Sequence, residues 1–209
     1  MLDLDGVIYN WLKSGLKLFN IDPEIERNRV LLKTYHDSLE MIRDKQEVFN
    51  AVEAAGSDFW SNLELLPWGI ELYESLTKLG NVTILTSPGL WTRAGQGKQI
   101  ALRRDFGINS FILAKEKHIC ARPNAILIDD KKKNVTNFRK AGGWSYLWPN
   151  QFCIQDEQPN INTAIYYCLE YVKDVRSKIA NRKVDEIMNV LSSDNLREEE
   201  LVEQQGLFA

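Results

Sequence analysis

The chain has 209 residues, of which 44% are hydrophobic and 26% charged, and its formal net charge at pH 7 is −3. This length suits one sizeable core, or a core with a small subdomain, and the charge gives no general attraction to nucleic acid or anionic membranes. The three cysteines are far apart and indicate neither a disulfide framework nor a zinc site. Because the sequence shows no signal peptide and no apolar run long enough to span a bilayer, we expect a cytoplasmic protein with no membrane contact.

The first apolar segment, residues 2–8, carries Asp3 and Asp5 and then Gly6. Alternate side chains share one face of an extended strand, so both carboxylates begin on the same side, and Gly6 permits a sharp turn after them. Such a strand end suits a divalent cation and an anionic substrate, although Asp and Gly are also common in ordinary turns. An EF-hand calcium loop is excluded, because its twelfth position counted from Asp3 is Ser14 rather than glutamate.

The next part of the chain, from about residue 11 to residue 65, shows helical spacing of apolar side chains and no strand-like alternation. Asp22-Pro23 is a typical helix start within it. A block of helices is therefore expected directly after the first strand.

Residues 70–147 show an alternation of helices and strands. Helices are expected at about 70–79, after a glycine-containing loop at 95–98, and after the basic run 131–133; the buried strands are expected at 82–85, 111–113, 125–128 and 145–147. This order predicts an α/β fold with a mainly parallel sheet and helices on both faces. Ligands bind such sheets at the carboxyl ends of the strands. Four of these ends carry polar groups, namely Asp3 and Asp5, Thr86 and Ser87, Lys115 and Lys117, and Asp129 and Asp130.

A long helix is expected after Pro159-Asn160. Its apolar residues alternate spacings of four and three, at Ile161, Ile165, Cys168, Val172, Val175 and Ile179. We favour packing of this helix on the sheet, because the stripe is shorter than a coiled coil needs, and a homodimer contact is the alternative. The glutamate-rich tail from Ser192 is expected to be solvated and mobile.

The polar groups at the strand ends match the needs of phosphate-ester hydrolysis, which requires a cation, donors for the phosphoryl oxygens, a nucleophile and a proton donor. Asp3, Asp129 and Asp130 can hold Mg²⁺, and the Thr86 hydroxyl can bind a phosphoryl oxygen. Asp3 can attack in line to form an aspartyl-phosphate, while Asp5 protonates the leaving oxygen and later activates water.

These segments also resemble a known family. Asp3-Leu4-Asp5-Gly6-Val7, Leu85-Thr86-Ser87, a lysine and Asp129-Asp130 are similar, in order and spacing, to the four motifs of the haloacid dehalogenase-like phosphohydrolases. Within that family, residues 62–67, the Thr86-Ser87-Pro88 turn, Gly97-Lys98 and residues 127–130 resemble the 5′(3′)-deoxyribonucleotidase branch. The resemblance covers about residues 1–150.

The family resemblance implies a Rossmann-like catalytic core at residues 1–11 and 66–150, with a small helical cap at 12–65 inserted after the first strand. Residues 151–209 would then be a C-terminal helical extension. It also implies that Asp3 is the nucleophile and a metal ligand, and that Asp5 is the general acid/base and lends its backbone carbonyl to the metal.

The resemblance also implies roles for lysines and aromatic residues. Lys117 matches the family's motif lysine better than Lys115, because it is the last residue of a basic–acidic–lysine triplet. The phosphate-binding candidates are Thr86, Ser87, Lys98 and Lys115. The cap residues that would sandwich a base are Trp11, Tyr35, Phe59 and Trp60, although aromatic residues at helical spacing are usually core.

We therefore expect a Mg²⁺-dependent phosphomonoesterase that hydrolyses (deoxy)nucleoside monophosphates through an aspartyl-phosphate. The alternatives are a phosphatase of the same fold for another small phosphate ester, and a non-catalytic nucleotide-binding protein on this scaffold. A nucleic-acid end phosphatase is not favoured, because Lys131–Lys133 is the only compact basic run, whereas such an enzyme needs an open basic groove.

Overall fold

Two pairs of parallel strands form the centre of the structure, a computed structural model that describes residues 1–22, 25, 44–149 and 160–206. In one pair β1 (Leu85–Thr86) lies beside β2 (Ile112–Leu113), and in the other β3 (Ile126–Asp129) lies beside β4 (Trp144–Leu147). These strands correspond to the four that the sequence predicts between residues 82 and 147; β1 begins three residues later than predicted, and the other ends differ by at most one residue.

The N-terminal segment joins the two pairs of strands. Leu2 forms parallel bridges with Ile84 on one side and with Ile128 on the other. The Leu2 amide donates to the Thr83 carbonyl at 2.9 Å, and the Asp3 amide donates to the Ile128 carbonyl at 3.0 Å. The first residues of the chain therefore run between β1 and β3, and the carboxyl ends of these strands meet at one edge.

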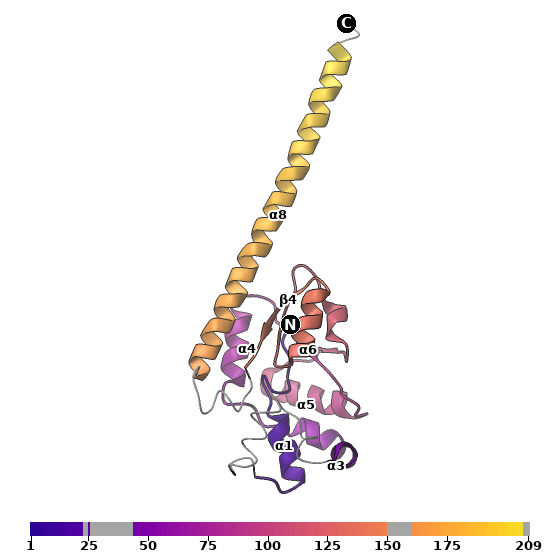
Figure 1. The fold of residues 1–209 in the computed structure, drawn as a ribbon, viewed down its shortest axis with the longest axis vertical. Helices are drawn as coiled ribbons and strands as arrows, with labels where there is room; N and C mark the ends of the chain where they lie inside the picture. The colour runs from indigo at the N-terminus through magenta and orange to yellow at the C-terminus, as the bar shows by residue number, and fades with distance from the viewer. Residues whose placement is uncertain (23–24, 26–43, 150–159, 207–209) are drawn as a thin grey trace. The chain divides into compact units, whose positions relative to one another are not determined.

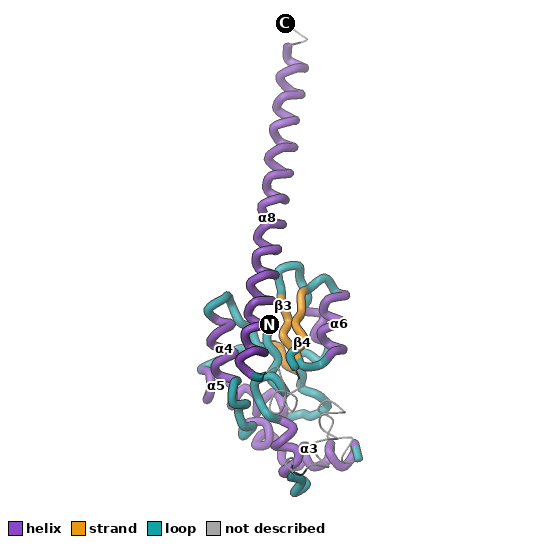
Figure 2. Tube along the Cα trace, turned by 60° about the vertical axis from the view of Figure 1, so that its left-hand side comes forward, coloured by secondary structure: helices purple, strands orange, loops and turns teal. Residues whose placement is uncertain are grey.

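Helices lie on both sides of these strands. Figures 1 and 2 show α4 (Gly69–Thr77) on one side and α6 (Lys132–Lys140) on the other. Phe138 of α6 packs with Leu85, Ala114 and Leu127 in a buried apolar cluster, which fixes α6 on the strands. The remaining helices of the described residues are α1 (Trp11–Leu18), α3 (Lys45–Ser61), α5 (Ala94–Phe106), the 3-10 helix η2 (Lys117–Cys120) and α8 (Ile161–Gly206). The predicted mixed α/β class is confirmed.

The helical block after the first strand is described only in part. The Asn10 side chain caps α1 by accepting from the Lys13 amide, and the Asp44 side chain caps α3. Helix α3 bends at Gly56, which has a φ of 63°, and packs against α5. The predicted division into core, cap and extension stays a prediction, and the helix start at Asp22-Pro23 lies partly outside the described residues.

The C-terminal helix α8 is longer than the sequence predicts. It continues through the glutamate-rich segment to Gly206, so the tail expected from Ser192 is helical. The structure divides into two compact units, Met1–Tyr171 and Val172–Ala209. Among the described residues, no helix combines the length and the apolar character that crossing a membrane requires.

The prediction of a glycine-containing loop at residues 95–98 is wrong, because these residues lie in the first turns of α5. Gly97 is needed there for close helix packing rather than for a loop. A Cβ at this position would lie 2.4 Å from both the Ser57 carbonyl oxygen and the Trp60 Cβ on α3. Contacts this short force one helix to move, so only glycine lets α3 and α5 approach so closely.

We predict that Gly97→Ala lowers the free energy of unfolding by about 1–3 kcal/mol, the usual cost of overpacking. The loss should appear even though alanine favours a helix over glycine by up to about 1 kcal/mol. Urea denaturation measures it, with Gln99→Ala at an exposed position of the same helix as the control. If both variants are as stable as the wild type, the contact between α3 and α5 is looser than described.

Candidate active site

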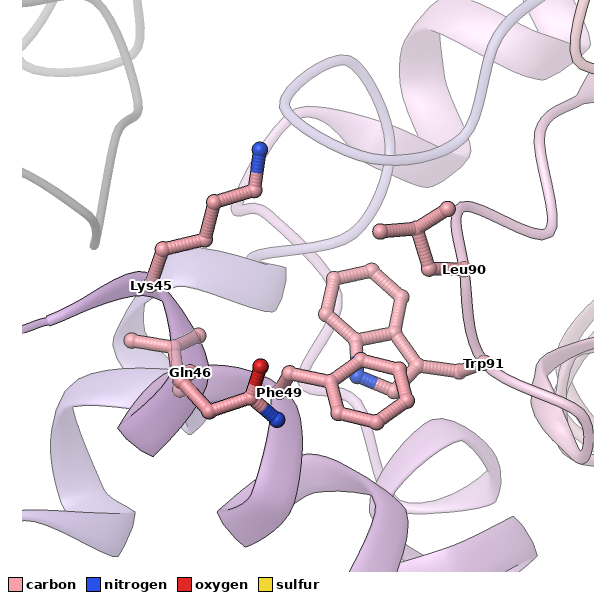
Figure 3. Close-up of a pocket in the computed structure, with 6 residues that line it drawn as sticks. Lys45, Gln46, Phe49, Leu90 and Trp91 are labelled. Carbon is pink, nitrogen blue, oxygen red and sulfur yellow. The ribbon is translucent and has the colours of Figure 1, made fainter.

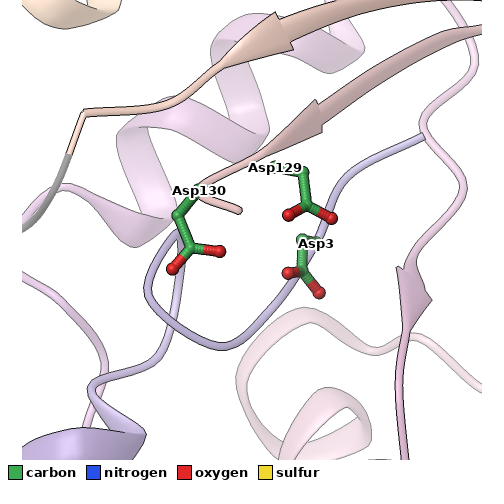
Figure 4. Close-up of side chains that lie close together, drawn as sticks. All are labelled: Asp3, Asp129 and Asp130. Carbon is green, nitrogen blue, oxygen red and sulfur yellow. The ribbon is translucent and has the colours of Figure 1, made fainter. Parts of the chain in front are cut away.

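Three carboxylates meet at the carboxyl end of β3. Asp3, Asp129 and Asp130 each place a carboxylate oxygen within 4.8 Å of the others (Figure 4). Asp3 and Asp129 are buried, with 4% and 0% of their surface exposed, and Asp130 is partly buried. Burying two ionised carboxylates side by side is costly unless cations compensate them. The cluster therefore requires positive charge, which neighbouring residues supply in part.

The turn after Asp3 is built by the residues that follow it. Gly6 has a φ of 81°, which the sequence pattern anticipates, and its amide donates to the Tyr9 carbonyl at 2.9 Å. The indole Nε1 of buried Trp68 donates to the Val7 carbonyl at 2.9 Å, and this hydrogen bond stabilises the turn. Asp5 lies in this turned segment, and its carboxylate reaches Lys98.

Lys117 is the cation that lies between two of these carboxylates. Its Nζ lies 2.6 Å from Asp3 Oδ1 and 2.6 Å from Asp129 Oδ2, and the side chain is 2% exposed. Burial alone would lower the pKa of Lys117, but the Asp3 and Asp129 carboxylates outweigh it and hold that pKa above its ordinary value. Lys115, the alternative lysine, is exposed at the surface. The structure thus brings Lys117, rather than Lys115, to the aspartates.

Asp129 is held by more partners than the sequence indicates. Its Oδ1 accepts from the Lys131 amide at 2.8 Å, and the Asn134 amide group donates to both of its oxygens, at 3.1 and 3.0 Å. Burial and the nearby Asp3 charge nevertheless raise the pKa of Asp129, against the lowering effect of Lys117. The sequence motifs do not indicate Asn134 as a functional residue. The one feature that could have indicated it is that it is a polar residue in the first turn of the helix after the strand.

The carboxylate cluster fits a hard divalent cation. Mg²⁺ prefers oxygen ligands and usually takes one or two carboxylates together with waters and a phosphate oxygen. Asp3, Asp129 and Asp130 supply such oxygens, and Lys117 pairs with the first two. Burial and the nearby Asp3 charge raise the pKa of Asp129, and a bound cation would oppose both effects by stabilising the ionised carboxylate.

A second lysine lies on the other side of the strand ends. The Lys98 Nζ, from α5, donates to Asp5 Oδ2 at 2.5 Å, to Thr86 Oγ1 at 2.9 Å and to the Ser87 carbonyl at 2.7 Å. Lys98 is 1% exposed, so it is fixed in this position. The Ser87 hydroxyl accepts from the Gly89 amide at 3.0 Å and closes the turn. The other oxygen of Asp5, Oδ1, is buried and has no hydrogen-bond partner within the described part of the chain.

An aromatic cluster adjoins Lys98. The Nζ of Lys98 lies 4.8 Å from the centre of the Trp60 ring, which in turn lies 5.3 Å from the ring of Trp91. Trp11 also contacts Trp91, with ring centroids 6.2 Å apart, and Phe59 packs edge-on against Trp60 at 5.0 Å. Three of the four predicted cap aromatics therefore gather beside the strand ends. Tyr35, the fourth, lies outside the described residues.

Trp91 is the centre of this cluster and was missed by sequence reasoning. It follows Gly89, whose φ of 63° and missing Cβ allow the indole to fold back over the turn. A tryptophan two residues after a Pro-Gly pair at a strand end is the only signal that could have indicated it. The Trp91 Nε1 is buried and lacks a hydrogen-bond partner among the described residues.

A pocket of about 400 Å³ opens beside Trp91 (Figure 3). Phe49 and Trp91 line it with rings that are nearly parallel, at an angle of 18° and a centroid separation of 6.5 Å. Leu90 and Val48 add apolar surface, and the polar side chains of the lining are those of Lys45 and Gln46. An apolar pocket with a few polar groups is the usual form of a small-molecule site.

We predict that Mg²⁺ stabilises the protein through the carboxylate cluster. At a concentration one hundred times its Kd, a ligand that binds only the folded state adds about 2.7 kcal/mol of stability. Thermal unfolding with and without Mg²⁺ should therefore show a higher Tm for the wild type and a much smaller shift for Asp130→Asn. Asp174→Asn, at an exposed ion pair on α8, should keep the full shift. An equal shift in all three proteins would place the cation elsewhere.

No family model and no curated protein matches this sequence. Among solved structures, the chain is similar to a dehalogenase and to a dehalogenase with an intermediate complex. For each of the two, the sequence identity is 13% and the TM-score is 0.43, and the match covers 78% of this chain and 92% of the other. It is also similar to a haloacid dehalogenase-like family hydrolase from Streptococcus pneumoniae, at 18% identity and a TM-score of 0.43 over 79% of this chain and 96% of that one. Haloacid dehalogenase-like hydrolases, whose motifs the sequence resembles, are thus among the structures similar to this chain.

Proposed function

We propose that this protein is a Mg²⁺-dependent phosphomonoesterase that hydrolyses (deoxy)nucleoside monophosphates to nucleoside and phosphate. The observation that carries the proposal is the meeting of Asp3, Asp129 and Asp130 at one sheet edge, with Lys117 paired to Asp3 and Asp129. Lys98 and Thr86 lie at the same edge and offer donors for a phosphate. A nucleophile, a cation site and phosphate donors are the parts that phosphoryl transfer needs.

Asp3 is the proposed nucleophile. Its Oδ1 accepts from the Leu4 amide at 2.8 Å and pairs with Lys117, so the carboxylate is held in one orientation. Attack of an Asp3 oxygen on phosphorus breaks the ester bond and forms an aspartyl-phosphate. Water then attacks this phosphorus, which releases inorganic phosphate and restores the carboxylate.

Asp5 is the proposed general acid and base. It donates a proton to the leaving ester oxygen in the first step and takes a proton from the attacking water in the second, so its protonation is restored over the cycle. Lys98 at 2.5 Å from Asp5 Oδ2 is fixed beside it and positions this carboxyl. The partly buried setting of Asp5 also limits competition from bulk water.

The phosphoryl group would be held by fixed donors. The Thr86 hydroxyl accepts from the buried Lys98 ammonium at 2.9 Å, so its own proton is left to donate to a phosphoryl oxygen, and the Lys98 charge lies beside it at the Ser87 turn. Mg²⁺ bound by the aspartates would neutralise charge on the phosphate as Asp3 attacks. We assign the motif-lysine role to Lys117, because Lys115 is exposed and lies outside the carboxylate cluster.

The preference for nucleotides rests on the aromatic side of the site. Trp60 contacts Lys98 and Trp91, so the aromatic cluster begins directly beside the proposed phosphate site. A purine or pyrimidine base is flat and packs well on aromatic rings, as single-stranded nucleic acids do on proteins. Phe49 and Trp91 offer such rings, with Gln46 and Lys45 as hydrogen-bond partners for the base edge.

We predict that the protein releases phosphate from a panel of deoxy- and ribonucleoside monophosphates in the presence of Mg²⁺. Asp3→Asn should abolish the release, because an amide is a poor nucleophile and cannot form the aspartyl-phosphate. Phosphate release measured by colorimetry tests both points, and Asp174→Asn, remote from these residues in sequence, serves as the matched control.

Other outcomes of this panel separate the alternatives. Release from sugar phosphates but not from nucleotides would keep the mechanism and discard the aromatic cluster as a base site. Nucleotide binding without any phosphate release would favour a binding protein on this scaffold, and would contradict the proposed reaction.

We predict that Trp91→Ala weakens the use of nucleotides without weakening the chemistry. Loss of one aromatic partner for a base costs about 1–3 kcal/mol, so kcat/KM for a nucleotide should fall roughly 5- to 150-fold, mainly through KM. The kcat/KM for a small phosphate ester without a base should stay nearly unchanged. Tyr166→Ala, at an exposed aromatic residue on α8, is the control. Equal losses for both substrates would show that Trp91 supports the fold rather than the base.

A further inference from the structure

The part of α8 from Val172 onward carries its charges in two blocks of opposite sign. The second compact unit begins at Val172, and all of its described residues belong to this one continuous helix (Figure 1). Residues 173–183 contain five basic residues and one acidic residue, whereas residues 185–203 contain seven acidic residues and one basic residue. A helix with mixed charges on a solvated surface would not be expected to separate its signs in this way.

Exposed apolar side chains lie at the boundary between the two charge blocks. Val184 and Ile187 are 57% and 59% exposed, and Leu191 continues their spacing of three and four residues. Residues at this spacing share one face of a helix. The face is thus apolar where the sign of the charge changes.

We propose that α8 pairs in an antiparallel orientation with α8 of a second copy of this chain, with Ile187 at the centre of the contact and Val184 on the same face. In this orientation, the basic block of each copy lies beside the acidic block of the other. A parallel pair would instead place basic beside basic and acidic beside acidic. Like charges side by side repel, so the charge pattern selects the antiparallel arrangement.

The proposed contact is a symmetric one. An antiparallel helix pair has a two-fold axis through its centre, and the same surface of each copy serves both sides. Residues 173–203 would form a contact about 45 Å long at 1.5 Å per residue. A helix of this kind gains most of its stability from packing of its apolar face, which a second copy supplies. The proposal rests on none of the residues placed in the active site.

Sedimentation equilibrium of the full chain over a range of concentrations tests the proposal. The wild type should form a dimer, and Ile187→Glu should raise the dimer Kd at least tenfold, because it puts two like charges at the centre of the contact. Asn189→Glu adds the same charge at a position that the helical period places on the opposite face, and should leave the Kd within about threefold. A wild type that stays monomeric, or equal effects of the two substitutions, would overturn the proposal.

The orientation of the pair is tested by salt and by charge reversal. Added NaCl should weaken an antiparallel dimer by screening the attraction between opposite blocks, whereas it would strengthen a parallel dimer by screening repulsion. The triple substitution Glu198→Lys, Glu199→Lys and Glu200→Lys should raise the dimer Kd at low salt, since it places basic blocks together. A dimer that tightens with salt, or that survives the triple substitution unchanged, would overturn the antiparallel arrangement.

Discussion

The Lys117 ammonium between Asp3 and Asp129 is the interaction on which the site depends. It joins residues from three parts of the chain, at 2.6 Å to each carboxylate, in surroundings almost closed to solvent. Breaking a buried ion pair by removing one partner usually costs about 3–5 kcal/mol, because a charge is left uncompensated. The same contact orients Asp3 for the attack that we propose. Stability of the sheet edge and readiness for catalysis thus rely on one side chain.

The arrangement of the strands explains why these groups meet. Leu2 lies between the β1 and β3 segments, so Asp3 emerges at the centre of the sheet edge, with Thr86 on one side and Asp129 on the other. The close approach of α5 to α3 at Gly97 then brings Lys98 to Asp5 and to Thr86. In our proposal, one lysine serves the nucleophile and the other serves the phosphate. The aromatic cluster adjoins Lys98, because the Lys98 Nζ lies over the ring of Trp60.

Residues whose position follows from a strand end could be predicted from the sequence. Asp3, Thr86 and Asp129 each sit just after an apolar run, and parallel strands bring such ends together. The choice of Lys117 over Lys115 rests on the family resemblance instead. The sequence indicates Lys98 as a functional residue but does not indicate that it is buried. The glycines before Lys98 favour a loop, whereas their packing against α3 is a tertiary effect. The places of Asn134 and Trp91 depend on how α6 and the turn at Gly89 fold back, which the weak local signals at these positions do not determine.

The central claim is that Asp3 becomes phosphorylated during turnover. Quenching the enzyme with acid during steady-state hydrolysis of a nucleoside monophosphate, followed by borohydride reduction, converts an aspartyl-phosphate to homoserine, which peptide mass spectrometry locates in the sequence. Our account predicts homoserine at position 3, dependent on both substrate and Mg²⁺. Phosphate release without modification of any aspartate, or modification at an aspartate other than Asp3, would contradict it.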